Sequence, residues 1–550
     1  MWKTIPTREI AVGCRPPFSF YFDLVGRHWK SECNRLPIHR ICTLARKQNA
    51  TFFTIEDALS RPLVQTEIEA LDISQGGSGE AQAMSLSFFS SPDWPVDCQE
   101  LPLADLDVGS LRASDFLGQA VIINYRQRGQ ASFSSSYVFE AIFPPPRLPS
   151  QRRTGRTSNS VRRELLNNFI YTREKFVCEV RSRQFETAGL YYCQQNSLTH
   201  VCAHASLRMA LTSESNSEIT PDYVNKLLGV SPSCDGLALG DLVRVIEDQG
   251  KCAEVIICQE RDRKTGKYRP ILPRETYISV LASIVESGST ALLTFSTAGD
   301  ENGTQGNAGP DHVVFVYGHT RHSDEWHPQA IAAYAGPASA PYYPASSWID
   351  HFLIHDDNFG PYYTLSSSAL EFKKEVTAHK IIAIRDIRIG TASQFAEANA
   401  ASQLANSLPR LAHLGSGQWF NYLTIAPRKF VLRTILMEKK RYLAHLKKIQ
   451  GHDGTRMRDI EIHPFKNLPE RFWMVEFSLP PLFTGNHSKL GEIIVSVNKL
   501  AESPDDATIL ALRLPSLSLV RDAAENLIPH ASSLLAHVEI FRVKPHTVIW

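Results

Sequence analysis

One stretch, residues 191–211, holds the residue types best suited to chemistry, because a cysteine there follows two glutamines and precedes a run of helix formers. Ala, Leu, Arg and Met are frequent in residues 203–211, and neither Gly nor Pro interrupts them, so the run predicts a helix that begins at Cys202. The positive end of a helix dipole favours thiolate over thiol, and thiolate is the attacking species. We therefore predict that Cys202 is a nucleophile. The alternative is an ordinary buried thiol.

A cysteine nucleophile needs a base, a group that orients the base, and donors for the oxyanion that forms on an attacked carbonyl. The sequence offers a candidate for each. His312 begins a β-branched run that predicts a buried strand, and Asp356 follows the next predicted strand. Gln195 lies seven residues before Cys202, and its amide is a candidate oxyanion donor.

These residues resemble the catalytic residues of the double-glycine-leader peptidases that process bacteriocins, a branch of the papain-like cysteine peptidases. The resemblance includes the pattern Cys-x-x-x-x-Leu-x-Met, a following helix and strand, a histidine strand, and a strand that ends at an acidic residue. It covers about residues 185–365 and leaves both flanks unmatched. The matching positions are Cys202, Leu207, Met209, His312, and residues 239–257 and 354–356.

The resemblance implies a papain-like fold with a helical lobe, a lobe of antiparallel sheet, and a thiol protease cleft between them. It implies that Cys202 is the nucleophile and that His312 is the base, which pairs with the thiolate and later protonates the leaving amine. Asp356 would orient His312, and Gln195 would donate to the oxyanion together with the backbone N–H of Cys202. No cofactor and no metal is expected.

The sequence leaves three of these roles open. The family has its glutamine about six residues before the cysteine and favours Asp-Cys-Gly there, whereas this chain has Val201-Cys202-Ala203. The candidate oxyanion donors are Gln195, Gln194 and Asn196. The candidate orienting residues are Asp356, Asp357 and Asn358. The candidate bases are His312, His200 and His204.

The length of 550 residues is too great for one hydrophobic core, and we expect three folded units of α+β class. The hydrophobic share of 43% and the charged share of 21% are those of a folded globular protein. The expected units are an N-terminal α+β domain at residues 1–146, a basic linker at 147–163, a papain-like domain at 164–366, and a C-terminal α+β domain at 367–550.

The formal net charge of +1 provides no overall field to attract nucleic acid or an anionic membrane. Six arginines lie in residues 147–163, and residues 430–449 predict a basic amphipathic helix, so nucleic-acid binding is kept as a minor hypothesis. The expected partners are a protein or peptide substrate and a regulatory protein.

The ten cysteines include no C-x-x-C pair, which argues against a zinc ribbon and against a disulfide framework. Lys3, Arg8 and Glu9 stand where a signal peptide would be apolar, and no run approaches 18 apolar residues. We therefore expect a protein of the reducing cytoplasm with no membrane association. A bacterial origin is part of the leading hypothesis.

The leading hypothesis is a cysteine peptidase, a hydrolase that cleaves a peptide or isopeptide bond through a Cys–His–Asp triad and a thioester acyl-enzyme. The same site could instead catalyse transglutaminase-like acyl transfer, because the acyl-enzyme is common to both reactions and only the acceptor differs. A third hypothesis is a non-catalytic regulatory protein that keeps a papain-like scaffold and binds a peptide in its cleft.

Overall fold

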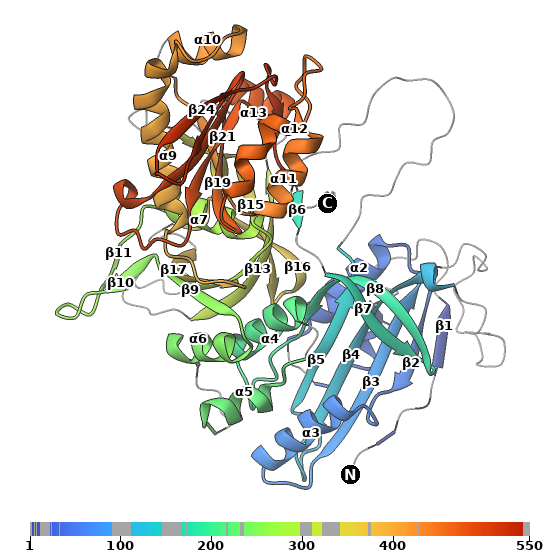
Figure 1. The fold of residues 1–550 in the computed structure, drawn as a ribbon. Coiled ribbons are helices and arrows are strands. Elements are labelled where there is room, and N and C mark those ends of the chain that lie inside the picture. The colour runs from blue at the N-terminus through green and yellow to red at the C-terminus, as the bar shows by residue number, and fades with distance from the viewer. Residues whose placement is uncertain are drawn as a thin grey trace.

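The computed structural model describes the chain in blocks, and the basic linker expected at residues 147–163 lies outside them. The described residues are 3–4, 6, 8–11, 22–23, 25–31, 34–90, 112–145, 168–170, 173–215, 218–231, 236–297, 311–321, 342–371, 376–425 and 428–542. Helices and mostly antiparallel sheets make up these blocks (Figure 1), so the chain is mixed α and β. No helix in this part of the chain is both long and apolar enough to cross a membrane.

An N-terminal sheet of seven strands has a helix against each face. In order across the sheet, the strands are β1 (Arg8–Ala11), β2 (Phe52–Asp57), β3 (Glu80–Phe89), β4 (Phe116–Arg126), β5 (Ser135–Phe143), β8 (Arg183–Tyr192) and β7 (Arg173–Val180). The helices are α2 (Leu36–Lys47) and α3 (Pro62–Ser74). Ala120 and Ile122 share a core with α2, whereas Val121 and Ile123 share one with α3. Successive side chains of a strand point to opposite faces, so β4 is buried on both.

The central sheet lies between a layer of three helices and a single helix on its other face. In order, its strands are β16 (Gly360–Ser366), β15 (Ile349–Asp356), β13 (His312–Arg321), β12 (Thr290–Thr297), β17 (Val376–Arg385) and β9 (Cys252–Ile257), and β6 (Asn168–Ile170) also pairs with β13. The helices are α4 (Cys202–Glu214), α5 (Pro221–Leu228), α6 (Leu239–Asp248) and α7 (Arg274–Glu286). Val313 and Phe315 pack with α4, and Val314 and Val316 pack with α7. The apolar run of β13 is therefore buried on both faces.

The C-terminal sheet completes the fold. In order, its strands are β14 (Tyr343–Pro344), β18 (Val431–Glu438), β19 (Arg471–Ser478), β21 (Gly491–Ser496), β22 (Ile509–Leu514), β23 (Leu517–Arg521) and β24 (Leu527–Ala531). Its helices are α9 (Ser393–Ser407), α10 (Gln418–Ile425), α11 (Lys439–Lys448), α12 (Asp459–Ile462) and α13 (Pro480–Asn486). Two separate pairs of short strands are β10 (Gln259–Arg261) with β11 (Tyr268–Pro270), and β20 (Ser488–Lys489) with β25 (Val538–Glu539).

The prediction of one helix over residues 430–449 is wrong in its first half. Residues 431–438 form strand β18, and only residues 439–448 form a helix, α11. Val431, Thr434 and Ile435 are β-branched and buried. All of residues 431–438 pair with β19, and Val431 and Leu432 also pair with β14, so neighbouring strands supply the backbone hydrogen bonds of a sheet. Tertiary pairing therefore overrides the helical spacing of the apolar residues.

The strands do not divide among the sheets at the expected domain boundaries. Strands β7 and β8 follow residue 164 but belong to the N-terminal sheet, and β17 follows residue 366 but belongs to the central sheet. One hydrophobic core contains Val25, Tyr192 and Ile384, so the N-terminal and central sheets are packed as a single body. A sequence pattern identifies a strand, but it does not identify the sheet that the strand joins.

Candidate active site

Cys202 is the first residue of α4, as the sequence predicts. Val201 precedes it with an extended backbone, and the N–H of Val201 donates to Nδ1 of His204 at 3.4 Å, which ties down the start of the helix. Every residue from 203 to 213 is buried, whereas Cys202 is partly exposed. The thiol therefore stands at the accessible N-terminus of an otherwise buried helix, where the helix dipole favours an anion.

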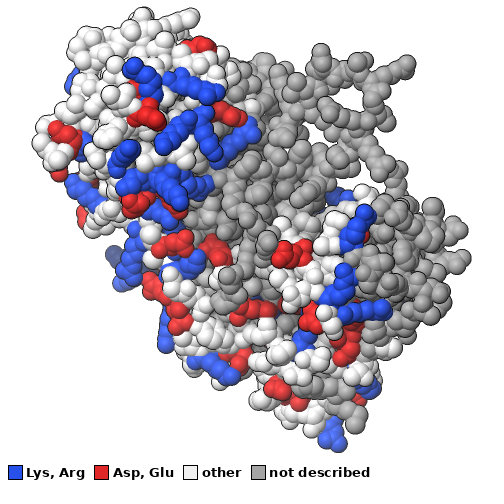
Figure 2. Space-filling model, turned by 45° about the vertical axis from the view of Figure 1, so that its right-hand side comes forward, with Lys and Arg blue, Asp and Glu red and all other residues white. Residues whose placement is uncertain are grey.

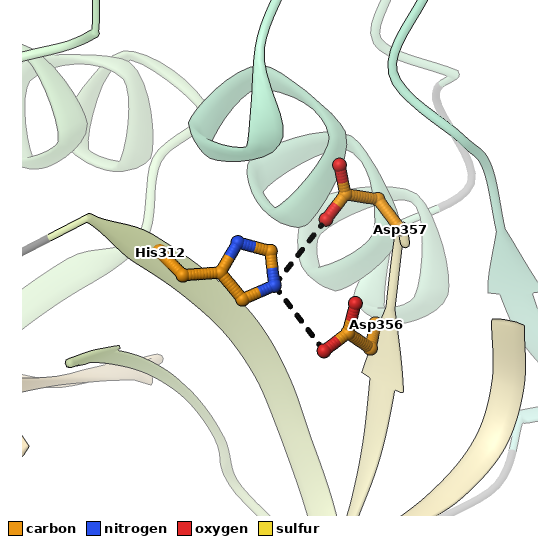
Figure 3. Close-up of side chains that lie close together, drawn as sticks. All are labelled: His312, Asp356 and Asp357. Atoms are coloured by element: carbon orange, nitrogen blue, oxygen red, sulfur yellow. Dashed lines mark ion pairs between the residues drawn. The ribbon is translucent and has the colours of Figure 1, made fainter. Parts of the chain in front are cut away.

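His312 is the first residue of β13, and Asp356 is the last residue of β15. These two strands pair in antiparallel fashion, so the start of one lies beside the end of the other. Nε2 of His312 lies 3.2 Å from Oδ2 of Asp356 and 3.7 Å from Oδ1 of Asp357 (Figure 3). The contact with Asp356 is an ion pair and not a straight hydrogen bond, because the N–H is not aligned with the oxygen.

The carboxylate of Asp356 is fixed by its own turn. Its Oδ1 accepts the backbone N–H of Asn358 at 2.8 Å and that of Phe359 at 3.3 Å. The side chain is almost fully buried, so these bonds and the ion pair with His312 replace its contacts with water. Asp356 is thus held in one orientation with Oδ2 toward the imidazole.

The imidazole of His312 interacts with both Asp356 and Cys202. Burial by itself lowers the pKa of His312, but the side chains of Asp356 and Cys202, together with the charge of Asp357, outweigh burial and raise the pKa to about 11. The histidine is therefore a cation at neutral pH. An imidazolium beside a thiol stabilises the thiolate, which is the arrangement that a cysteine nucleophile needs.

Two of the three candidate oxyanion donors have structural roles. Oε1 of buried Gln194 accepts the N–H of Val138 at 3.1 Å, and its Nε2 donates to the carbonyl of Asn34 at 3.2 Å. Oδ1 of buried Asn196 accepts the backbone N–H groups of Leu198, Thr199 and His200. Both amides therefore hold the loop that leads into α4.

Gln195 is the candidate whose amide remains at the site. It is only partly buried, and its Nε2 donates to Oδ1 of Asn358 at 3.3 Å. Asn358 belongs to the turn that holds Asp356, so Gln195 lies beside the acidic end of the site. A neutral amide acceptor at that distance is weaker than an oxyanion, so a substrate can take over this donor.

The two histidines next to Cys202 bind elsewhere in the fold. Nε2 of His200 lies 3.3 Å from Oε1 of Glu67, and Nε2 of His204 lies 2.9 Å from Oδ1 of Asn225. Burial and the charge of His200 lower the pKa of His204 to about 4, although Asn225 and Glu67 oppose the change. Of the three candidate bases, only His312 combines a carboxylate partner with contact to the thiol.

The N-terminal unit supports the site through contacts that the sequence did not predict. The side-chain amide of Asn34 donates to the carbonyl of Asn358 at 2.5 Å, and Arg40 donates to the carbonyl of Pro361 at 3.0 Å. Glu67 accepts from Asn196 at 3.1 Å in the loop before Cys202. These contacts join residues more than a hundred positions apart, so no local sequence pattern predicts them.

Asp357 is the second carboxyl group at the site, and the sequence named it only as a competitor of Asp356. It is fully buried, and neither of its oxygens has a hydrogen-bond partner within the described ranges. Burial raises the pKa of Asp357 to about 7; the charge of His312 opposes the shift and that of Asp356 adds to it. Asp357 is therefore ionised only in part at neutral pH.

The substitution Asp357→Asn is expected to raise the unfolding temperature at pH 8 by about 5 °C and to have a smaller effect at pH 5. The pKa of Asp357 is higher in the folded chain than its ordinary 3.8, so folding favours the protonated form and stability falls as the pH rises from about 4 to 7. An amide lacks the charge that burial penalises. Thermal unfolding at both pH values measures the effect.

The matched control is Asp356→Asn. That substitution removes the carboxylate that accepts two backbone N–H groups and pairs with His312, so it should lower the unfolding temperature at pH 8. If Asp357→Asn lowers the unfolding temperature at pH 8 as much as the control does, Asp357 is not a buried carboxyl group whose charge destabilises the fold.

The same three side chains are also the residues that could hold a metal. Within the described ranges, His312, Asp356 and Asp357 are the group of possible ligands whose atoms all lie within 4.8 Å of one another. A cation there would take the Nε2 atom that otherwise faces the two carboxylates (Figure 3). Experiments on the Cys202 thiol therefore need a parallel sample that contains a metal chelator.

Comparison with known proteins adds no family to these observations. No protein-family model matches the chain, and no curated protein matches it. The chemistry of the site is thus inferred from Cys202, His312 and the carboxylates that surround them.

Proposed function

We propose that this protein is a cysteine peptidase that hydrolyses a peptide or isopeptide bond in a protein substrate. The observation that carries the proposal is the position of His312, whose ring interacts with both the thiol of Cys202 and the carboxylate of Asp356. The nucleophile comes from a helix and its two partners come from a facing sheet, an arrangement that supports a papain-like cleft between two lobes.

In the proposed reaction, the Cys202 thiolate attacks the carbonyl carbon of the scissile bond, and the carbonyl oxygen becomes an oxyanion. The backbone N–H of Cys202 and the amide of Gln195 donate to that oxyanion. When the C–N bond breaks, a thioester forms and the proton of His312 passes to the leaving amine. The acylated sulfur carries no charge, so it no longer raises the pKa of His312, and the proton is released more readily.

The second half of the reaction regenerates the thiol. Neutral His312 takes a proton from water, the resulting hydroxide attacks the thioester carbon, and the C–S bond breaks to leave a carboxylic acid and the thiolate–imidazolium pair. Asp356 keeps Nε2 of His312 toward itself throughout, so the other ring nitrogen stays available to the sulfur and to the leaving group.

The proposal includes the reducing cytoplasm as the compartment. All the cysteines of the described ranges are free thiols: Cys42, Cys178, Cys193, Cys202, Cys252 and Cys258. Free thiols persist where the surroundings are reducing, and a nucleophilic thiolate survives best there.

Labelling with a peptide vinyl sulfone tests the proposal, because a thiolate adds to this electrophile without any oxidant. The chain contains its own controls. Burial raises the pKa of four thiols to about 12: Cys42, Cys178, Cys193 and Cys258. Cys252 is partly exposed like Cys202 and provides the matched comparison.

At pH 6, peptide mapping by mass spectrometry is expected to find the probe on Cys202 and almost none on Cys252, because the imidazolium of His312, which would stabilise a thiolate, interacts with Cys202. The result should be the same with and without a chelator. Equal labelling of both cysteines, or labelling that persists unchanged in Cys202→Ser, would remove Cys202 as the nucleophile.

A further inference from the structure

A cavity lies in the C-terminal unit, whose seven-stranded sheet is separate from the sheet that carries His312 and Asp356. It has a volume of about 550 Å³, between α11 and the residues that follow β25. This volume is in the range of small-molecule sites. Its apolar wall is formed by Ile449, Ile540 and Phe541. Its cationic side chains are Arg441, Lys448 and Arg542.

Positive charge exceeds negative charge around this cavity. Glu539 is the carboxylate among the lining residues, and it forms an ion pair with Arg542. Lys448 is exposed and forms no ion pair within the described ranges. The guanidinium of Arg441 lies 5.7 Å from the centre of the Phe541 ring, which fixes it along the cavity wall. Figure 2 shows Lys and Arg gathered over the upper part of the molecule, where the C-terminal unit lies.

His445 lines the cavity and is kept neutral by its surroundings. Burial lowers the pKa of His445 well below its ordinary value, the charges of Lys489 and Arg513 lower it further, and Glu492 opposes them. Nε2 of His445 is buried and has no hydrogen-bond partner within the described ranges. His445 therefore adds no positive charge of its own to the cavity wall.

The helix dipole explains only part of this arrangement. Basic residues in the last turn stabilise the negative end of a helix, which accounts for Lys447 and Lys448. It does not account for Arg441 in the first turn or for Arg542 on another segment. Arg441 and Lys448 are seven residues apart, so they lie on one face of α11, two turns from each other, and both line the cavity.

We propose that this cavity binds a small phosphate-bearing molecule of the size of a nucleoside phosphate. Arginine and lysine donate charge-assisted hydrogen bonds to phosphate oxygens, and the donors at Arg441, Lys448 and Arg542 come from two segments that face each other. The wall at Ile540 and Phe541 accommodates the less polar part of the ligand. A concave site suits a small anion better than a nucleic-acid strand, which needs an extended track of cations.

Calorimetric titration of the full chain with ATP and with pyrophosphate tests the proposal. The variant Arg441→Gln/Lys448→Gln removes two cavity cations, and Lys440→Gln/Lys447→Gln removes two cations from the same helix with the same spacing, outside the cavity. Glutamine keeps the helix propensity of lysine and arginine. The cavity variant is expected to weaken binding about 10- to 100-fold, and the matched control should bind within about twofold of wild type.

Absence of heat with both probes for the wild-type chain would overturn the proposal. Equal weakening of ligand binding by the two double variants would also overturn it, because the cations would then act as a general basic surface. If a single-stranded oligonucleotide is weakened equally by both variants, that surface is one for nucleic acid. Arg542→Gln tests the opposite wall should the cavity variant unfold. Labelling of Cys202 should be unchanged in all of these variants. The ligand-binding proposal and the peptidase proposal can therefore be disproved separately.

Discussion

Replacing Cys202 with alanine is expected to lower peptide hydrolysis by about 10⁴- to 10⁶-fold, the loss typical of removing the nucleophile of a catalytic triad. No other described thiol can replace it, because Cys252 is the other partly exposed one and the remaining four are buried. Digestion of a mixed peptide pool by the wild-type chain, followed by mass spectrometry, identifies cleaved peptides. Their initial rates are then compared between wild type and variant.

The matched control for this substitution is Cys252→Ala, which should cleave the same peptides at the wild-type rate. Addition of a primary amine to the wild-type reaction separates hydrolysis from acyl transfer, because a transferase would join the amine to the peptide. Cleavage by Cys202→Ala at the wild-type rate would contradict the proposed function. If the wild-type chain is labelled at Cys202 but cleaves no peptide of the pool, the enzyme has a narrow substrate specificity.

Replacing His312 with alanine is expected to slow vinyl sulfone labelling of Cys202 by about 10- to 100-fold at pH 6 and to have little effect at pH 9. An imidazolium stabilises a neighbouring thiolate by its charge, and this support matters most at pH 6, where an ordinary thiol is almost entirely protonated. The loss is limited, because a more basic thiolate is also a better nucleophile. The pH dependence of the labelling rate measures both effects.

The internal reference for this measurement is Cys252 in the same sample, whose labelling rate should follow the same pH curve in wild type and variant. The double variant Asp356→Asn/Asp357→Asn, which keeps the imidazole but removes both carboxylates, should move the Cys202 curve in the same direction as His312→Ala by a smaller amount. An unchanged pH curve in His312→Ala would show that His312 does not act on the thiol.

Local sequence was sufficient to locate the reactive ends of two elements. The helix formers after Cys202 and the β-branched run after His312 depend on interactions between near neighbours, and the structure begins a helix and a strand at these two residues. Local sequence was insufficient at residues 431–438, where the apolar spacing suits a helix but pairing with β14 and β19 produces a strand. Strand formation there depends on partners that are distant in the sequence.

The choice among neighbouring glutamines and carboxylates also depended on distant partners. Gln194 and Asn196 are held by the N-terminal unit and by their own loop, which leaves Gln195 at the site. Asp356 receives its orientation from two N–H groups of its turn, whereas the carboxyl oxygens of buried Asp357 have no hydrogen-bond partner in the part of the chain that the structure describes. Residue type alone does not distinguish these positions, because adjacent residues differ mainly in the direction of their side chains.

The sequence by itself determined which residues could do chemistry and where their helix and strand begin. Only the tertiary structure decided that they meet. The antiparallel pairing of β13 with β15 sets Asp356 3.2 Å from His312, and the packing of α4 on that sheet sets the thiol of Cys202 against the same imidazole. Helix and strand starts are encoded by neighbours along the chain, whereas the meeting of three side chains depends on a core shared by two sheets.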